Sequence, residues 1–334
     1  MTRGDDTTWT RLGLGYHSNA GARGVLDELV RRNGVRLHVG ESALNRPIEA
    51  CRWRLGDPAE SGLGAADEKR PGVSLRPQAG ATAEPQPGPH LFLLSLIHPM
   101  EWIGREIHLA LLGDLLGGRI AVPPGTIVTS LLDANPDGTA RVEAALRAER
   151  PSWNRGNARG VDLNRNFPTA FRTRPRWIDF WPMWRPGPGP ASEPETRAVL
   201  EAAGDRPTLV LSLHSFGRWI FYPPSHSRAI DATVESHGEI AERALQDAPA
   251  RGYRHRSLGR YAWWFRAYGT EIDAFLPSHS FLVELSWGGF GRWGLRRLLD
   301  PFFTFNPPDP SGEYERVGPT LRRIIEIGLG GGAT

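Results

Sequence analysis

Four short, almost wholly apolar runs occur along the chain, and each has the composition of a strand that is buried on both faces. The runs are residues 90–97, 126–132, 208–213 and 280–285. Longer segments between them predict helices at about 102–116, 192–203 and 230–246. Ser192 stands three residues before Glu195, a capping box that predicts the start of the second helix. Buried strands that alternate with helices predict an α/β fold with a mainly parallel sheet.

The first part of the chain has a different pattern. Residues 22–33 predict a short amphipathic helix, and residues 35–40 and 48–53 alternate like the strands of a hairpin. Residues 56–89 are rich in Pro, Gly and Ala and contain no aromatic residue, which predicts a flexible surface insertion. We therefore expect one three-layer α/β/α domain over residues 1–334, with a mixed, mainly parallel twisted sheet and a frayed tail at 330–334.

Composition narrows the possible partners. Of 334 residues, 40 are Lys or Arg and 37 are Asp or Glu, and the basic residues are scattered among the acidic ones, so we expect no nucleic-acid partner. No apolar run approaches the length of a membrane span, and the polar N-terminus does not resemble a signal peptide. We accordingly expect a cytoplasmic protein without a membrane partner. A single cysteine, Cys51, means that a metal site would have to use histidine and carboxylate ligands.

Metal-binding side chains follow two of the predicted strands. His98 and Glu101 come after the first strand, and His214 ends the third. The carboxyl ends of parallel strands are where α/β proteins place their sites, and two histidines with one glutamate form a catalytic zinc set. Each feature alone is weak, because a lone histidine at a strand end is more often structural.

Two further features allow both a functional and a structural interpretation. Glu284 lies inside the apolar run 280–285, where a carboxylate either faces a cavity, metal or arginine, or simply faces solvent. The polar segment 155–168 could be a solvated loop, or its adjacent Asn164 and Arg165 could hold a substrate carboxylate. After the second strand, residues 135–138 read Asn-Pro-Asp-Gly, which predicts a turn.

Taken together, the motifs resemble the zinc carboxypeptidases of the carboxypeptidase A type, and in particular their bacterial members. His-Pro-Met-Glu at 98–101 is similar to the zinc motif of that family, and Asn-Pro-Asp-Gly at 135–138 to its turn. Gly-Val-Asp-Leu-Asn-Arg-Asn-Phe at 160–167, Leu-His-Ser at 213–215 and the strand at 281–285 follow in the family's order. The resemblance covers about residues 37–285, interrupted by the insertion.

The resemblance implies a role for each matching residue. His98, Glu101 and His214 would bind one Zn²⁺, and Asp162 would orient His98. Glu284 would act as general base, Arg155 would polarise the scissile carbonyl, and Asn164 and Arg165 would bind the terminal carboxylate of the substrate. Arg155 is assigned through the spacing Arg-x-Asn-x-x-Gly of bacterial relatives, with Asn154 as the rival register. Tyr268 and Tyr261 are candidates for the tyrosine that caps the substrate, although strict counting places Phe265 there, and Ile272 would lie at the side-chain pocket.

The implied function is zinc-dependent removal of the C-terminal residue of a peptide or cell-wall peptide that carries a free carboxylate. Two alternatives stay open: a zinc deacylase of the aspartoacylase and succinylglutamate desuccinylase type, and a non-catalytic binding protein. The binding protein would use tryptophans as a platform, namely Trp177, Trp181, Trp184, Trp219, Trp263 and Trp264. Ile272 favours an apolar terminal residue, whereas Glu271, Arg260 and Arg266 could recognise a charged one.

Overall fold

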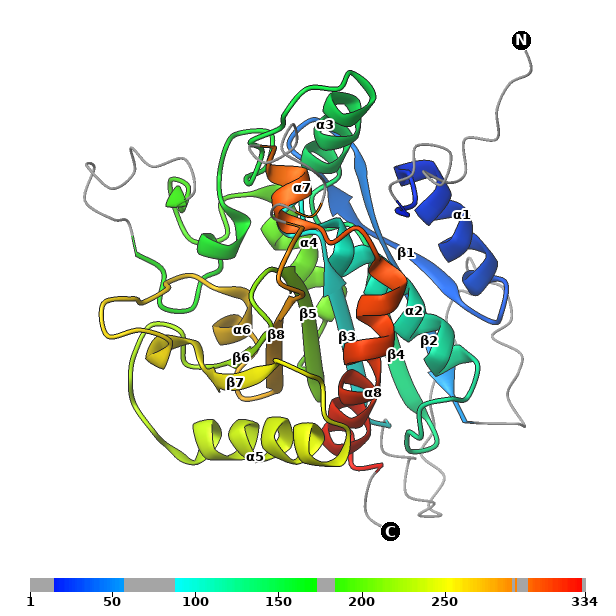
Figure 1. The fold of residues 1–334 in the computed structure, drawn as a ribbon, viewed down its shortest axis with the longest axis vertical. Coiled ribbons are helices and arrows are strands. Elements are labelled where there is room, and N and C mark those ends of the chain that lie inside the picture. Colours follow the sequence, from blue (N-terminus) through cyan, green and yellow to red (C-terminus); the bar gives the residue numbers. More distant parts are fainter. Residues whose placement is uncertain (1–14, 57–87, 173–183, 290–291, 293–299, 332–334) are drawn as a thin grey trace, which may run out of the picture.

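The computed structural model describes residues 15–56, 88–172, 184–289, 292 and 300–331, and these form one mixed sheet with helices on both faces (Figure 1). Its eight strands are β1 (Val35–Glu41), β2 (Pro47–Leu55), β3 (His90–Ser95), β4 (Thr126–Leu131), β5 (Leu209–Ser215), β6 (Trp219–Tyr222), β7 (Arg254–Ser257) and β8 (His279–Leu285). They are ordered β1-β2-β4-β3-β5-β8-β6-β7 across the sheet.

The four central strands, β4, β3, β5 and β8, are parallel to one another. β1 and β2 form the predicted antiparallel hairpin, and β2 adds antiparallel to β4. At the opposite edge β6 is antiparallel to β8 and parallel to β7. The prediction of a mixed, mainly parallel sheet is thereby confirmed.

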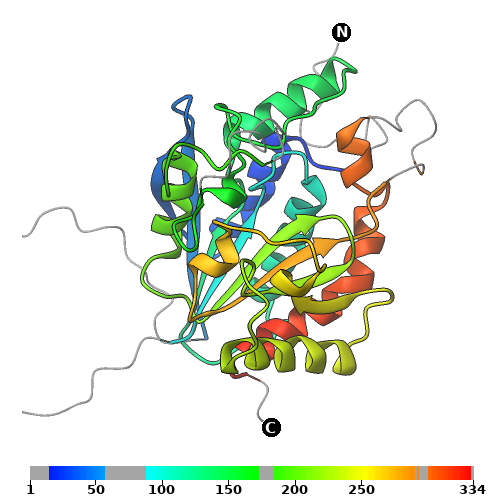
Figure 2. The same cartoon turned by 90° about the vertical axis from the view of Figure 1, so that its left-hand side faces the viewer.

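Helices cover both faces, which gives the three layers visible in the side view (Figure 2). The described helices are α1 (Asn19–Val30), α2 (Trp102–Leu116), α3 (Pro136–Arg147), α4 (Pro194–Ala203), α5 (Ala232–Asp247), α6 (Glu271–Ala274), α7 (Pro301–Phe305) and α8 (Pro310–Gly328). Helices α1, α2, α5 and α8 share one apolar core with the sheet, and α4 packs on the other face.

The two cores explain why the central strands are apolar without alternation. In β3, Leu91 and Leu93 enter the core under α2, while Phe92 and Leu94 enter the core under α4. Each of these four side chains is fully buried. A strand that is covered on both faces has no position for a polar side chain until it ends, so polar groups collect at the strand ends.

Two local predictions from the sequence are wrong, and several elements were not predicted. The Asn-Pro-Asp-Gly segment does not form an isolated turn but begins α3. Asn135 Oδ1 accepts a hydrogen bond from the Gly138 N–H (3.1 Å) and so caps the helix, and Pro136 occupies its first turn. Helix α4 starts at Pro194 with Glu193 rather than Ser192 as its N-cap residue. The hydrophobic pattern did not predict strands β6 and β7 or helices α7 and α8.

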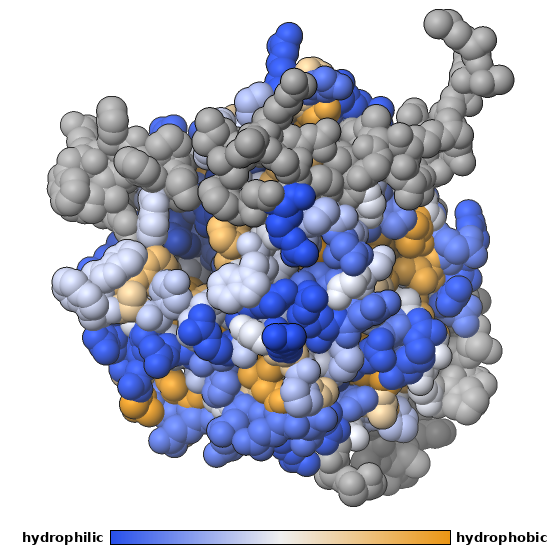
Figure 3. Space-filling view, in the orientation of Figure 1, coloured by the Kyte–Doolittle hydropathy of each residue, from blue (hydrophilic) through white to orange (hydrophobic). Residues whose placement is uncertain are grey.

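Most of the predicted insertion lies outside the described residues, as do the last three residues of the predicted tail. The single-domain organisation of residues 1–334 therefore stays a prediction. In the orientation of Figure 1 the surface is mostly hydrophilic, with apolar residues in small separate patches (Figure 3). Within the described part of the chain, no helix combines the length and the apolar character that crossing a membrane requires.

Candidate metal centre and active site

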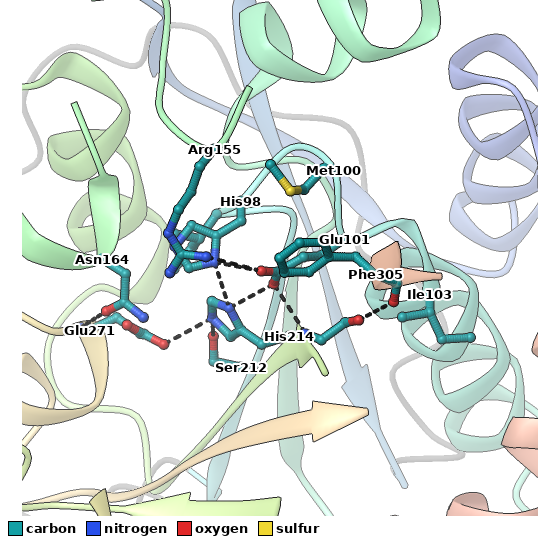
Figure 4. Close-up of polar contacts among 12 residues, drawn as sticks. His98, Met100, Glu101, Ile103, Arg155, Asn164, Ser212, His214, Glu271 and Phe305 are labelled. Carbon is teal, nitrogen blue, oxygen red and sulfur yellow. Dashed lines mark hydrogen bonds and ion pairs between the residues drawn. The ribbon is translucent and has the colours of Figure 1, made fainter. Parts of the chain in front are cut away.

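The three candidate metal ligands lie at the carboxyl ends of two neighbouring strands. His98 follows β3 and Glu101 is the N-cap residue of α2, while His214 belongs to β5. Because β3 and β5 are parallel and paired up to Ser95 and Leu213, the two histidines emerge side by side (Figure 4). All three ligand side chains are at most 2% exposed.

The ligand atoms converge on one point. His98 Nδ1 lies 2.9 Å from Glu101 Oε1, and His214 Nδ1 lies 3.0 Å from Glu101 Oε2. The two Nδ1 atoms are 3.1 Å apart. Two ligand atoms bound to one tetrahedral zinc ion are separated by about 3.3 Å, since each Zn–N or Zn–O bond is about 2.0–2.1 Å long. The observed separations therefore fit a shared zinc ion.

The other nitrogen of each imidazole contacts a buried carboxylate. His98 Nε2 lies 3.1 Å from Asp162 Oδ1, and His214 Nε2 lies 3.0 Å from Glu271 Oε1. A carboxylate only accepts hydrogen bonds, so Nε2 of each ring carries the hydrogen and donates it. With both rings neutral, two Nδ1 lone pairs and the Glu101 carboxylate face one another, an arrangement that needs a cation among them.

In the absence of metal, the pKa values of His214 and Glu101 also indicate that the site favours positive charge. Burial would lower the pKa of His214, but its hydrogen bonds to Glu101 and Glu271 raise it to about 10. Burial would raise the pKa of Glu101, but His98 and His214 hold it well below its ordinary value. The site thus stabilises positive charge, and the residues present fit a divalent metal ion.

Glu284 faces this centre from the next strand. In the parallel pair β5 and β8 it stands directly beside His214. Its Oε2 atom is buried and has no hydrogen-bond partner among the described residues. Burial and the charge of Glu101 raise the pKa of Glu284 to about 8, although His214 and Arg155 partly offset them. Of the two interpretations of Glu284, the structure supports the one in which it faces a cavity.

A cavity of about 260 Å³ joins the predicted site residues. Its lining comprises His98, Arg155, Asn164, Arg165, Trp184, Ser215, Phe216, Leu258, Phe265, Leu282, Glu284 and Phe305. Arg155 Nη1 lies 3.5 Å from Glu101 Oε1, and its Nε donates to Asp162 Oδ2 at 3.1 Å. Asn154, the rival to Arg155, instead donates to the Gly138 carbonyl at 3.3 Å.

Asp162 and Asn157 hold the loop that carries the cavity residues. Asp162 Oδ1 accepts a hydrogen bond from the Asn164 N–H (3.0 Å) and so caps the short 3₁₀ helix Leu163–Arg165. Asn157 Oδ1 accepts from the Val161 N–H (3.1 Å), and its Nδ2 donates to the carboxylates of Glu193 and Glu195 (2.8 and 2.9 Å). The polar segment is therefore a buried, tightly bonded loop rather than a solvated one.

Comparison with known proteins agrees with this geometry. Residues 25–294 match the family model described as zinc carboxypeptidase. The chain belongs to the zinc carboxypeptidase family. Zinc is the metal of that family, and the described residues supply a His98, Glu101 and His214 set that could hold it.

Two curated relatives are similar to this chain over part of their length. Carboxypeptidase O from Bos taurus is 30% identical over 123 residues, and carboxypeptidase O from Homo sapiens is 34% identical over 123 residues. Each alignment covers 35% of this chain and 33% of the relative, so the match spans about a third of the length of these curated proteins.

Solved structures show the likeness of the fold over nearly the whole chain. Carboxypeptidase A from Helicoverpa armigera superimposes with a TM-score of 0.66 at 21% identity, covering 94% of this chain and 74% of that one. Bovine thrombin-activatable fibrinolysis inhibitor, in complex with tick carboxypeptidase inhibitor, gives 0.65 at 19% identity, covering 96% and 99%. The predicted family and fold class are confirmed.

Two residues predicted to contact substrate are placed elsewhere. The Tyr268 ring lies against Arg172, whose guanidinium carbon is 4.6 Å from the ring centroid, and Tyr268 is absent from the described lining of the cavity. Phe265 lines the cavity instead, as counting along the sequence indicates, with Tyr261 packed edge-on against it. Ile272 is fully buried behind the cavity, in one apolar cluster with Leu258 and Leu282, which line it.

Glu271 has a place that the sequence pattern does not reveal. This side chain is fully buried on His214 and therefore cannot recognise a charged substrate group in the cavity. Among the tryptophans, Trp184 lines the cavity, Trp219 stacks on Phe221, and Trp263 and Trp264 are 80% and 66% exposed. Two others named above, at 177 and 181, lie outside the described residues.

We expect one tightly bound zinc ion per chain, and we expect His214→Ala to lose most of it, because the variant removes one of three ligands. Elemental analysis after zinc reconstitution and removal of excess metal measures both. His255→Ala, which changes a histidine of β7 outside the site, is the matched control and should keep the zinc. A zinc-free wild type, or an unchanged zinc content in His214→Ala, would contradict the assignment.

Proposed function

We propose that the protein is a zinc-dependent metallocarboxypeptidase that hydrolyses the C-terminal amide bond of a peptide. The proposal rests on the set of residues that line one cavity. Glu284, Arg155 and the pair Asn164 and Arg165 line it together with the metal-ligand candidate His98. A base, a group that can polarise a carbonyl and a fork for a carboxylate thus surround one space.

Each of these residues has a role that follows from its position. Zinc held by His98, Glu101 and His214 would act as a Lewis acid toward water and the scissile carbonyl. Glu284, whose Oε2 lacks a partner among the described residues, would take the proton of the attacking water and later deliver it to the leaving amine. Arg155 is held by Asp162 with its guanidinium edge toward the cavity, where it would stabilise negative charge on the carbonyl oxygen.

The terminal carboxylate of the substrate would bind Asn164 and Arg165. Arg165 offers charged N–H donors in a planar fork, and its guanidinium carbon lies 5.0 Å from the centroid of the Trp184 ring, which supports it from one side. Recognition of a free carboxylate restricts cleavage to the last residue of the chain. This restriction distinguishes a carboxypeptidase from an endopeptidase.

The walls of the cavity support an apolar terminal side chain. Leu258, Phe265 and Leu282 line it, and Ile272 backs two of them. The Arg155-x-Asn157-x-x-Gly160 spacing supports the bacterial type of the family, for which short cytoplasmic peptides or cell-wall peptides with a free carboxylate are the proposed substrates. A panel of peptides that differ only in the terminal residue, with γ-D-glutamyl-diaminopimelate included, would rank these substrates.

Glu284→Gln should keep zinc and fold but lose most activity, because the amide is nearly isosteric yet cannot accept the proton of water. Loss of a general base typically lowers the rate by roughly 10²–10⁴-fold. The assay is turnover of a C-terminally apolar peptide at saturating zinc. Glu201→Gln, the same change at an exposed position of α4, should be unaffected. Near-normal turnover of Glu284→Gln would show that Glu284 is a structural strand residue.

The wild type should cleave free-acid peptides and refuse the corresponding amides. Arg165→Ala should lower kcat/KM on free-acid peptides by at least ~10-fold, since a charge-assisted bidentate contact contributes about 1.5–3 kcal/mol. Arg165→Lys, which keeps the charge without the fork, should be intermediate. Arg243→Ala on the exposed side of α5 is the matched control.

Rates on amidated peptides should stay low in all of these variants. Equal cleavage of acid and amide forms by the wild type would contradict the carboxypeptidase proposal. It would favour an endopeptidase instead.

A further inference from the structure

We infer that Glu271 is a positioning residue for the metal centre, and that it joins the metal ligand His214 to the substrate-binding Asn164. The inference rests on the proposed function, because it assumes that zinc binds His214. Glu271 lies at the first position of α6, 57 residues after His214 in the sequence and on a different element. It does not line the cavity, so it would position the metal and the substrate through its two hydrogen-bonded partners.

Its side chain determines which nitrogen of His214 faces the metal. Glu271 Oε1 accepts the hydrogen bond of His214 Nε2–H at 3.0 Å, and Ser212 Oγ lies 3.1 Å from the same nitrogen. With the hydrogen held on Nε2, the Nδ1 lone pair points toward Glu101 and His98 (Figure 4). A carboxylate in this position also makes the imidazole a stronger ligand.

The carboxylate of Glu271 is deeply buried and pairs with His214 among the described residues. The residue is fully buried, and its Oε2 atom has no hydrogen-bond partner among the described residues. No described arginine forms an ion pair with it; its ion pair is with His214 at 3.0 Å. A buried carboxylate of this kind is expensive unless a positive charge lies close by, which a metal bound to His214 would provide.

The backbone of Glu271 organises the substrate side of the same site. Its N–H donates to Asn164 Oδ1 at 3.1 Å, while the backbone N–H of Asn164 donates to Asp162 Oδ1 at 3.0 Å. With Oδ1 engaged, the Nδ2 donor of Asn164 is the group left to serve a carboxylate. Asn164 is thus held between the two acidic residues that orient His98 and His214, so one network sets both the ligands and the carboxylate site.

The decisive experiment is the zinc affinity of Glu271→Gln, measured by competition with a chromophoric chelator. The variant keeps an oxygen that can accept the His214 hydrogen bond but removes the charge, and we expect zinc to bind about 10-fold more weakly. Glu271→Ala, which removes both, should weaken zinc by up to ~100-fold, the upper range for such outer partners of metal ligands. The cobalt-substituted variants should show shifted absorption bands, because the ring of His214 is no longer held.

Asp273→Asn is the matched control. Asp273 is equally buried on α6, two residues away, but contacts Ser225 and His226 instead of His214. It should bind zinc like the wild type, and thermal unfolding of the metal-free proteins separates loss of fold from loss of affinity. Wild-type zinc affinity in Glu271→Gln, or an equal loss in Asp273→Asn, would overturn the inference.

These outcomes are distinct from failure of the proposed function. A wild type that binds zinc through His214 but hydrolyses no peptide would refute the carboxypeptidase proposal and leave the role of Glu271 intact. Zinc binding that does not depend on His214 would refute both.

Discussion

The site depends on one electrostatic constraint: buried acceptor atoms that face one another require a cation between them. Nδ1 of His98, Nδ1 of His214 and the Glu101 carboxylate meet at separations of 2.9–3.1 Å, and Asp162 and Glu271 hold the hydrogens of both imidazoles on the far side. Burial removes the water that would otherwise solvate these groups. A divalent metal ion would satisfy all of these acceptor atoms, and we propose that Asp162 and Glu271 support its binding site through the two histidines.

The order of the strands creates this constraint. Strands β3, β5 and β8 are parallel neighbours, so their carboxyl ends bring His98, His214 and Glu284 to one edge of the sheet. Each strand is packed on both faces by apolar residues, which makes the strand ends rigid platforms for polar side chains. The loop around Asp162 then closes the site from outside the sheet, and α6 closes it from the other side through Glu271.

Much of this could be predicted from the sequence, for a physical reason. A strand buried on both faces is a continuous apolar run, and the first polar residues after it must lie at the sheet edge where sites form. The apolar runs therefore predict β3, β4, β5 and β8, and they indicate His98, His214 and Glu284 as candidate site residues. The predicted helix 102–116 has the same bounds in the structure, because two glycines follow the apolar segment and end the helix there.

The remaining features depend on contacts between distant segments. Glu271 and His214 are 57 positions apart, and nothing in the sequence pairs one with the other. Tyr268 begins a segment that resembles one of the family, whereas the path of the chain places Phe265 in the cavity. Strand β7 consists of Arg254, His255, Arg256 and Ser257 at the edge of the sheet, so it shows no apolar pattern. Asn135 could cap a helix or begin a turn, and only the chain that follows decides between them.

We propose that His98, Glu101, His214, Asp162 and Glu271 form a metal site and not merely a network of hydrogen bonds. Anomalous diffraction at the zinc absorption edge, from crystals of the zinc-reconstituted protein, tests it most directly. We predict one strong anomalous peak per chain, in contact with Nδ1 of His98, Nδ1 of His214 and the carboxylate of Glu101. No peak there, or a zinc peak only on other side chains, would contradict it.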